Sequence, residues 1–206
     1  MDRRQALNLL GLGGIGALLN GRSPARAYSS QSVQLPSELA ELERRVATYI
    51  IEGRNVSTNF LTQYHVCTGC GEYVDKTTGK DMGEEVVQRM RRLYDSDPAK
   101  VEGKNPEDIF SDIVLRVYRS GQFRIEGDGF AASVDVRVYK DNAQELNWND
   151  TKNYLKLSWT DSQFESTFTD NGIDGIVDES SIPVVANKQQ DFLQHLQRIE
   201  NIFLQK

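Results

Sequence analysis

Two stretches near the middle of the chain alternate between apolar and polar residues, and this pattern limits the fold more than any other feature. In residues 133–139 valine occupies every second position, and the same alternation recurs over residues 154–159. Side chains of a β-strand point to opposite faces in turn, so each stretch predicts a strand that is buried on one face. Two further strands are marked by pairs of apolar residues: Phe123 with Ile125, and Phe164 with Phe168. Strands that follow one another without intervening helices indicate an antiparallel meander of four or five strands.

Three segments before these strands, and one after them, carry apolar residues at helical spacing. The segments are residues 35–50, 81–94, 105–121 and 192–203. Ser37, Asp81 and Asn105 are good N-cap residues and support the starts of the three early helices. We therefore expect an α+β fold in which N-terminal helices and a C-terminal helix pack on one face of the sheet.

The first 27 residues have the three parts of an export signal. Arg3 and Arg4 precede an apolar stretch from Leu9 to Leu19, which is well short of the roughly 20 residues that a membrane-spanning helix needs. Ala25 and Ala27 then supply the small residues of a cleavage site. Cleavage after Ala27 is expected.

This leader resembles a twin-arginine signal peptide, in which a dedicated export machinery reads the arginine pair. It departs from the family at Ala6 and Asn8, where Phe and Lys are usual. The resemblance implies a signal peptide over residues 1–27, with the export machinery as a partner. It also implies delivery of a folded protein to the periplasm or the extracellular space, or to the thylakoid lumen if the source has one. We expect a flexible leader at residues 28–34 and one α+β domain at residues 35–206, with no stable membrane anchor after cleavage.

The charge balance argues against ligands that carry many phosphates. The chain has 24 Lys and Arg against 30 Asp and Glu, which gives a net charge of -6. Four arginines and one aspartate lie in the leader, so the remainder has 20 basic and 29 acidic residues and a net charge of -9. Because like charges repel, we expect no binding to nucleic acid or to anionic lipid surfaces. A protein or a small molecule is the expected partner.

The two cysteines of the chain, Cys67 and Cys70, are three residues apart and follow His65. This segment resembles one half of a rubredoxin or zinc-ribbon site, and the second cysteine pair of those families is missing from the sequence. The resemblance implies a zinc or iron ion held by both thiolates, with His65 as a further ligand and with His195, a carboxylate or a second chain as the source of the fourth. Two other interpretations stay open, namely a structural disulfide and a thiol–disulfide redox centre. The surrounding glycines predict a turn here.

An acidic, glycine-rich segment lies between the last expected strand and the final helix. It resembles a degraded dockerin or EF-type loop, which implies Asp170, Asp174 and Asp178 as calcium ligands. The acids expected at the third and twelfth loop positions are missing. The alternative is a hairpin, because Asn171-Gly172 is a strong turn pair.

Common catalytic motifs are absent from the sequence. It has no phosphate-binding glycine loop, no HExxH zinc motif and no GxSxG nucleophile elbow. We therefore expect a binding protein more than an enzyme. Three functions stay open: an exported binding or interaction module with a structural cysteine pair, a thiol–disulfide oxidoreductase that uses Cys67 and Cys70, and a small metal-binding protein built on the same pair.

Overall fold

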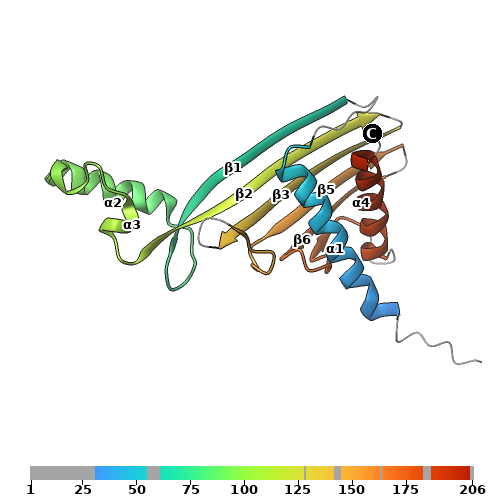
Figure 1. Cartoon of the computed structure of the whole chain (residues 1–206), viewed down its shortest axis with the longest axis horizontal. Helices are drawn as coiled ribbons and strands as arrows, with labels where there is room; N and C mark the ends of the chain where they lie inside the picture. The colour runs from blue at the N-terminus through green and yellow to red at the C-terminus, as the bar shows by residue number, and fades with distance from the viewer. Residues whose placement is uncertain are drawn as a thin grey trace, which may run out of the picture.

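The computed structural model describes residues 31–54, 61–127, 129–141, 145–162, 164–182 and 187–204 (Figure 1). The elements within these residues are, in chain order, α1 Gln31–Ile51, β1 Leu61–Asp75, α2 Gly83–Ser96, the 3-10 helix η1 Pro98–Lys100, α3 Pro106–Ile109, β2 Ile113–Gly127, β3 Phe130–Asp141, β4 Glu145–Leu146, β5 Tyr154–Asp161, β6 Glu165–Asn171, β7 Glu179–Ser180 and α4 Lys188–Leu204.

All strand pairs are antiparallel and form one sheet in the order β1-β2-β3-β5-β6-β7, with β4 paired to β3. Neighbours on this path follow one another along the chain, so the sheet is a meander. The predicted α+β class is confirmed. The sheet exceeds four or five strands because β1, β4 and β7 join the strands that apolar alternation marks.

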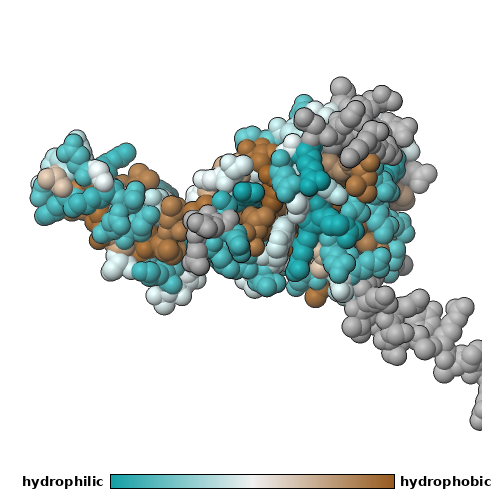
Figure 2. Space-filling model, in the orientation of Figure 1, coloured by the Kyte–Doolittle hydropathy of each residue, from teal (hydrophilic) through white to brown (hydrophobic). Residues whose placement is uncertain are grey.

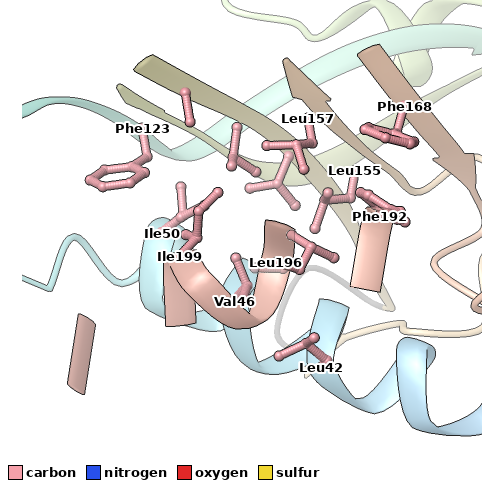
Figure 3. Close-up of a cluster of buried hydrophobic side chains, with 14 of the residues drawn as sticks. Leu42, Val46, Ile50, Phe123, Leu155, Leu157, Phe168, Phe192, Leu196 and Ile199 are labelled. Carbon is pink, nitrogen blue, oxygen red and sulfur yellow. The ribbon is translucent and has the colours of Figure 1, made fainter. Parts of the chain in front are cut away.

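Helices α1 and α4 lie side by side across one face of the sheet (Figure 1). The main core fills the layer between these helices and the strands, and Trp159, Phe123 and Phe168 are among its largest fully buried side chains. Figure 3 shows this layer through residues of both helices and three strands: Leu42, Val46, Ile50, Phe123, Leu155, Leu157, Phe168, Phe192, Leu196 and Ile199. Burial of these apolar side chains is the main force that holds the helices on the sheet.

The helices predicted over residues 35–50 and 192–203 are confirmed, but α1 begins earlier than predicted, at Gln31. Ser37 is therefore not its N-cap, and residues 31–34 of the expected flexible leader are helical. α1 stops before Gly53, whose φ of +64° lets the chain turn while its amide bonds to the carbonyl of Ile50 (3.0 Å). The apolar stripe of α4 lies in or against the core as predicted: Phe192, Leu196, Ile199 and Phe203. Both helices therefore bury the faces that their apolar spacing indicates.

The helix predicted over residues 105–121 is wrong beyond its first turn. Asn105 does precede a helix, but α3 ends at Ile109 and strand β2 begins at Ile113. The apolar residues that suggested a helix are four positions apart, and this spacing also fits one face of a strand. β-branched residues favour the extended chain, and pairing with β1 along residues 113–126 decides the outcome.

A helical arm projects from the body on the two strands of the β1–β2 ribbon (Figure 1). We define the arm as residues 76–112, which contain α2, η1 and α3. It has a small core of its own, in which Met82 and Val86 pack against Ile113 at the start of β2. Val87 on α2 and Leu115 on β2 are exposed, and Figure 2 shows apolar surface along the arm and the ribbon that carries it.

Candidate functional site

One face of the sheet is left uncovered by the described helices, and we call it the open face. Along β3, alternate side chains from Phe130 to Val138 are buried against the helices, whereas the residues between them are partly exposed. The same alternation continues along β5 and β6. The open face therefore carries the second residue set of each strand, which is mostly hydroxyl-bearing, amide or charged: Gln122, Arg124, Glu126, Ser133, Asp135, Arg137, Lys156, Ser158, Thr160, Thr167 and Thr169.

Small side chains on neighbouring strands create a hollow in the open face. Ala131 of β3 lies opposite Thr160 of β5, and Ser133 lies opposite Ser158, so four short side chains meet where these strands pair. The hollow encloses about 470 Å³. On the side of β1 and β2 it is lined by longer polar side chains: Gln63, Arg124 and Glu126.

Charges of both signs are mixed over the open face. Lys156 on β5 lies opposite Asp135 on β3, and Arg124 and Glu126 are two positions apart on β2. Such a surface has no strong preference for anions or for cations. Its serine and threonine hydroxyls both donate and accept hydrogen bonds. The arrangement can therefore bind a polar ligand of low net charge through hydrogen bonds.

Aromatic rings and guanidinium groups stack at the end of the open face nearest the arm. The guanidinium of Arg137 lies 4.4 Å from the ring centre of Tyr118 and 5.4 Å from that of Tyr154. The guanidinium of Arg116 lies 4.0 Å from the ring centre of Tyr139. Such cation–π contacts contribute about 0.5–1 kcal/mol each at exposed sites. They hold these long side chains in fixed positions.

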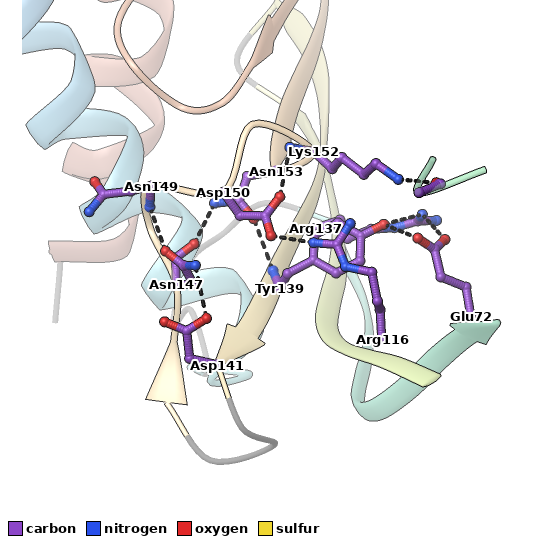
Figure 4. A network of polar contacts seen from close by, with 11 residues as sticks. Glu72, Arg116, Arg137, Tyr139, Asp141, Asn147, Asn149, Asp150, Lys152 and Asn153 are labelled. Carbon is purple, nitrogen blue, oxygen red and sulfur yellow. Dashed lines mark hydrogen bonds and ion pairs between the residues drawn. The ribbon is translucent and has the colours of Figure 1, made fainter. Parts of the chain in front are cut away.

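The hydroxyl of Tyr139 joins this cluster to the ribbon that carries the arm (Figure 4). It donates a hydrogen bond to Glu72 of β1 (2.7 Å), and the other carboxyl oxygen of Glu72 lies 3.4 Å from Arg137. Burial, and after it the bond to Glu72, raises the pKa of Tyr139 to about 12. The phenol therefore stays protonated and keeps this bond at neutral pH.

The loop before β5 makes two further contacts with the ribbon and the arm. Asp150 accepts a hydrogen bond from Arg116 of β2, and Lys152 donates one to the backbone carbonyl of Gly79 (Figure 4). Together with the Tyr139 bond, these contacts fix the direction in which the arm leaves the body. The network is therefore a structural joint.

Cys67 and Cys70 form a disulfide within β1, with their Cα atoms 5.9 Å apart. The turn predicted here is wrong, because β1 runs through the pair as one strand with a β-bulge. Cys67 pairs with Ser120 and Cys70 with Tyr118, so β1 has one residue more than β2 between these positions. Residues three apart normally point to opposite faces of a strand, and the extra residue brings both cysteines to the open face.

The bulge lies where the ribbon leaves the sheet. β3 pairs with β2 back to Tyr118, and beyond it β1 and β2 continue toward the arm as a two-stranded ribbon among the described strands. The disulfide thus braces the root of the arm. A strand bulge lacks the helix N-terminus that lowers the thiol pKa in many redox centres, which favours a structural role.

The predicted zinc or iron knuckle has no ligand set in the described part of the chain. His65 lies on the open face near Cys67, but no three His, Cys, Asp or Glu side chains among the described residues come together as a metal site. His195, the other histidine, lies on α4 and stacks on Trp159 with 4.3 Å between ring centres. Burial lowers the pKa of His195.

The aspartates of the acidic segment bind backbone amides of their own loop. Asp170 accepts from Asp174 and Gly175 (3.3 and 2.9 Å), Asp174 from Ile176 (3.0 Å), and Asp178 from Asn171 (2.7 Å). The calcium geometry implied by the resemblance is therefore not formed in the described residues. The segment connects the paired strands β6 and β7, which agrees with the hairpin interpretation.

Glu43 is a buried acidic residue that is not among the site residues predicted from the sequence. It lies on α1 with an exposed fraction of 0%, beside Asp170, whose exposed fraction is also 0%. Burial, and then the charge of Asp170, raises the pKa of Glu43 well above its usual value. A sequence signal exists, because Glu43 follows Leu39 by four residues and precedes Val46 by three, which places an acid within the apolar stripe.

The arginine pair predicted to direct export, Arg3 and Arg4, lies outside the described residues. Of the helices that the structure describes, none combines the length and the apolar character needed to cross a bilayer.

Comparison with protein-family models, with curated proteins and with solved structures finds no match for this chain.

Proposed function

We propose that the protein is an exported binding module that holds a polar ligand of low net charge on the open face of its sheet. The observation that carries the proposal is the hollow lined by Ser133, Ser158 and Thr160 in a face that the described helices leave free. Most small-molecule pockets are largely apolar, whereas this surface offers hydrogen bonds. Neutral oligosaccharides are the ligand class that we propose, because their hydroxyl groups donate and accept as the lining side chains do.

The mixture of charges supports a neutral ligand over a charged one. Arg124 and Lys156 supply donors, and Glu126 and Asp135 supply acceptors, so positive and negative groups border the same surface. An anionic or cationic ligand would meet repulsion as well as attraction there. A neutral polyhydroxy ligand can use both kinds of group at once.

We propose export because residues 1–27 resemble a signal peptide, and the disulfide supports this proposal. Disulfides persist in oxidising compartments outside the cytoplasm and are rare inside it. We propose that Cys67 and Cys70 are structural and keep the ribbon in shape beside the binding surface.

Chemical-shift mapping by NMR tests the proposal directly. Isotope-labelled protein is titrated with a panel of neutral oligosaccharides and with charged oligosaccharides of matched length. We expect the neutral members to shift the amide signals of residues 131–135 and 156–160, which underlie the hollow. Shifts confined to the arm or to the helix-covered side, or no shifts with any neutral member, would contradict the proposal.

A further inference from the structure

Two fully buried carboxyl groups meet between α1 and the sheet. Glu43 of α1 and Asp170 of β6 both have exposed fractions of 0%, and their carboxyl groups lie close enough to interact directly. Acidic side chains are almost never fully buried unless a partner compensates their charge. Among the described residues, no Lys, Arg or His forms an ion pair with either acid. A compensating cation is therefore missing from the described contacts of the pair.

The two acids differ in their hydrogen-bond partners. Asp170 accepts from the backbone amides of Asp174 (3.3 Å) and Gly175 (2.9 Å). Neither carboxyl oxygen of Glu43 accepts a hydrogen bond of normal geometry from a described residue, although the amide of Gly175 lies near enough to lower the pKa of Glu43. Amide donors stabilise an ionised carboxylate, so the negative charge belongs on Asp170. A proton on Glu43 makes that group a donor, and Asp170 is the acceptor beside it.

The other charged groups on α1 and in the loop do not compensate the negative charge of Glu43 and Asp170. Arg44 and Arg45 follow Glu43 directly, and adjacent helix positions do not share a face. Arg45 is ion-paired with Glu200 of α4 (2.6 Å). The nearby acid of the loop is Asp174, which adds negative charge.

The neighbouring elements add no compensating charge either. On β5, the residue opposite Asp170 is Leu155. From α4, the neutral amide of Gln189 and the ammonium of Lys188 both donate to backbone carbonyls of the loop. A shared proton is then the remaining way to reduce the charge of the pair.

We infer that Glu43 and Asp170 share one proton and form a pH-dependent latch between α1 and the loop of residues 170–178. With the proton in place, Glu43 donates to Asp170 and the two groups carry one negative charge between them. Loss of the proton leaves two negative charges side by side in the core. Their repulsion favours separation of α1 from the loop, so the latch is set by mild acid and weakened by alkali.

The pKa values have the direction that the latch requires. Burial raises the pKa of Glu43 well above 4.5, with the charge of Asp170 as the next cause. Burial also raises the pKa of Asp170 from 3.8 to about 6. The folded protein therefore binds more protons than the unfolded chain above about pH 4, and stability falls as the pH rises through about 6, with a further loss as Glu43 ionises.

Thermal unfolding of the full-length chain over a range of pH tests the latch. The melting temperature of the wild type should fall as the pH rises through about 6 and should continue to fall above it. In Glu43→Gln the part of the fall above about pH 6 should be lost, because the amide can donate to Asp170 without titrating, whereas the part due to Asp170 itself remains. Glu41→Gln is the matched control, since Glu41 is an exposed acid on the same helix, and it should keep the wild-type fall.

Infrared spectroscopy gives a second readout, and its decisive measurement is made on the wild type. At neutral pH the wild type should show the carbonyl stretch of a protonated, buried carboxylic acid, and Glu43→Gln should lack it. Absence of this band from the wild type would overturn the inference. A Glu43→Gln variant that keeps the full wild-type dependence of melting temperature on pH would overturn it as well.

Discussion

Gly175 lies so close to Pro36 that a β-carbon added to it would be 1.9 Å from the Pro36 carbonyl oxygen. Pro36 belongs to α1, and Gly175 lies in the loop between β6 and β7 with a φ of +83°. Both the available space and the backbone conformation therefore require glycine. This contact holds the loop against α1, the helix that carries Glu43, and so helps to place Asp170 beside Glu43.

Replacing Gly175 by alanine should destabilise the protein by about 3 kcal/mol or more, because a steric clash adds to an unfavourable φ. Gly103→Ala shares a positive φ of +71° but meets no atom within 4 Å, and it should cost about 1 kcal/mol. Gly69→Ala has neither problem and should change stability by less than about 0.5 kcal/mol. Urea unfolding of the three variants measures the order. A Gly175→Ala loss no larger than that of Gly103→Ala would mean that the loop is not seated on α1.

Removing the disulfide should lower stability modestly. The double variant Cys67→Ala, Cys70→Ala should lose about 1–2 kcal/mol, because a bond between residues three apart closes a very short loop. Amide hydrogen exchange in the arm should become faster, since the bond braces the bulge at its root. Unchanged exchange in the arm would contradict this bracing role. Insulin reduction by the wild type that needs both thiols would instead favour the oxidoreductase function.

Asn153 should contribute more to stability than any exposed asparagine of the same loop. Its side chain accepts from the amide of Tyr139 (2.9 Å) and donates to the carbonyl of Asn147 (2.8 Å), and Asn153 is fully buried. Asn153→Ala leaves both groups without this partner and should cost about 2–3 kcal/mol. Asn149→Ala, at an exposed position, should change stability by less than about 0.5 kcal/mol in the same urea titration. Equal losses would argue against a structural role for Asn153.

Replacing Arg3 and Arg4 by lysine should leave the precursor uncleaved inside the cell, because the export receptor reads the arginine pair. Cell fractionation and immunoblotting measure the outcome. Arg22→Lys preserves the pair and serves as the control, which should be exported and cleaved. Wild-type export of the double lysine variant would indicate a general secretory signal.

The elements that the sequence predicts best are those in which the spacing of apolar residues reflects burial of one face. β3 and β5 are found from strict alternation, and α1 and α4 from helical spacing, because solvent and core select different residues on the two sides. β1 is missed because glycines and cysteines in the segment from Cys67 to Gly71 have local turn preferences. Pairing with β2 along most of this 15-residue strand outweighs them, and local sequence does not record that pairing.

The candidate site depends on register, which the sequence does not state. Cys67 and Cys70 are only three residues apart in the sequence, but their common position on the open face follows from the bulge opposite β2. The hollow likewise follows from Ser133 meeting Ser158 across two strands. The position of Glu43 on the core side of α1 is readable from helical spacing, whereas its contact with Asp170 comes from tertiary packing.

The affinity of an open-face variant for a neutral oligosaccharide tests the central claim most directly. Ser133→Tyr fills the hollow from a partly exposed position on β3, without replacing a core side chain. Asn201→Tyr introduces the same side chain at an exposed position of α4 and is the matched control. The probe is the neutral oligosaccharide that gives the largest chemical-shift changes, and calorimetric titration measures its dissociation constant. We predict that Ser133→Tyr weakens binding by about tenfold or more, equivalent to about 1.4 kcal/mol, and that Asn201→Tyr leaves it unchanged. Wild-type affinity in Ser133→Tyr, or no measurable binding of any neutral oligosaccharide to the wild type, would contradict the claim that the open face is the binding surface.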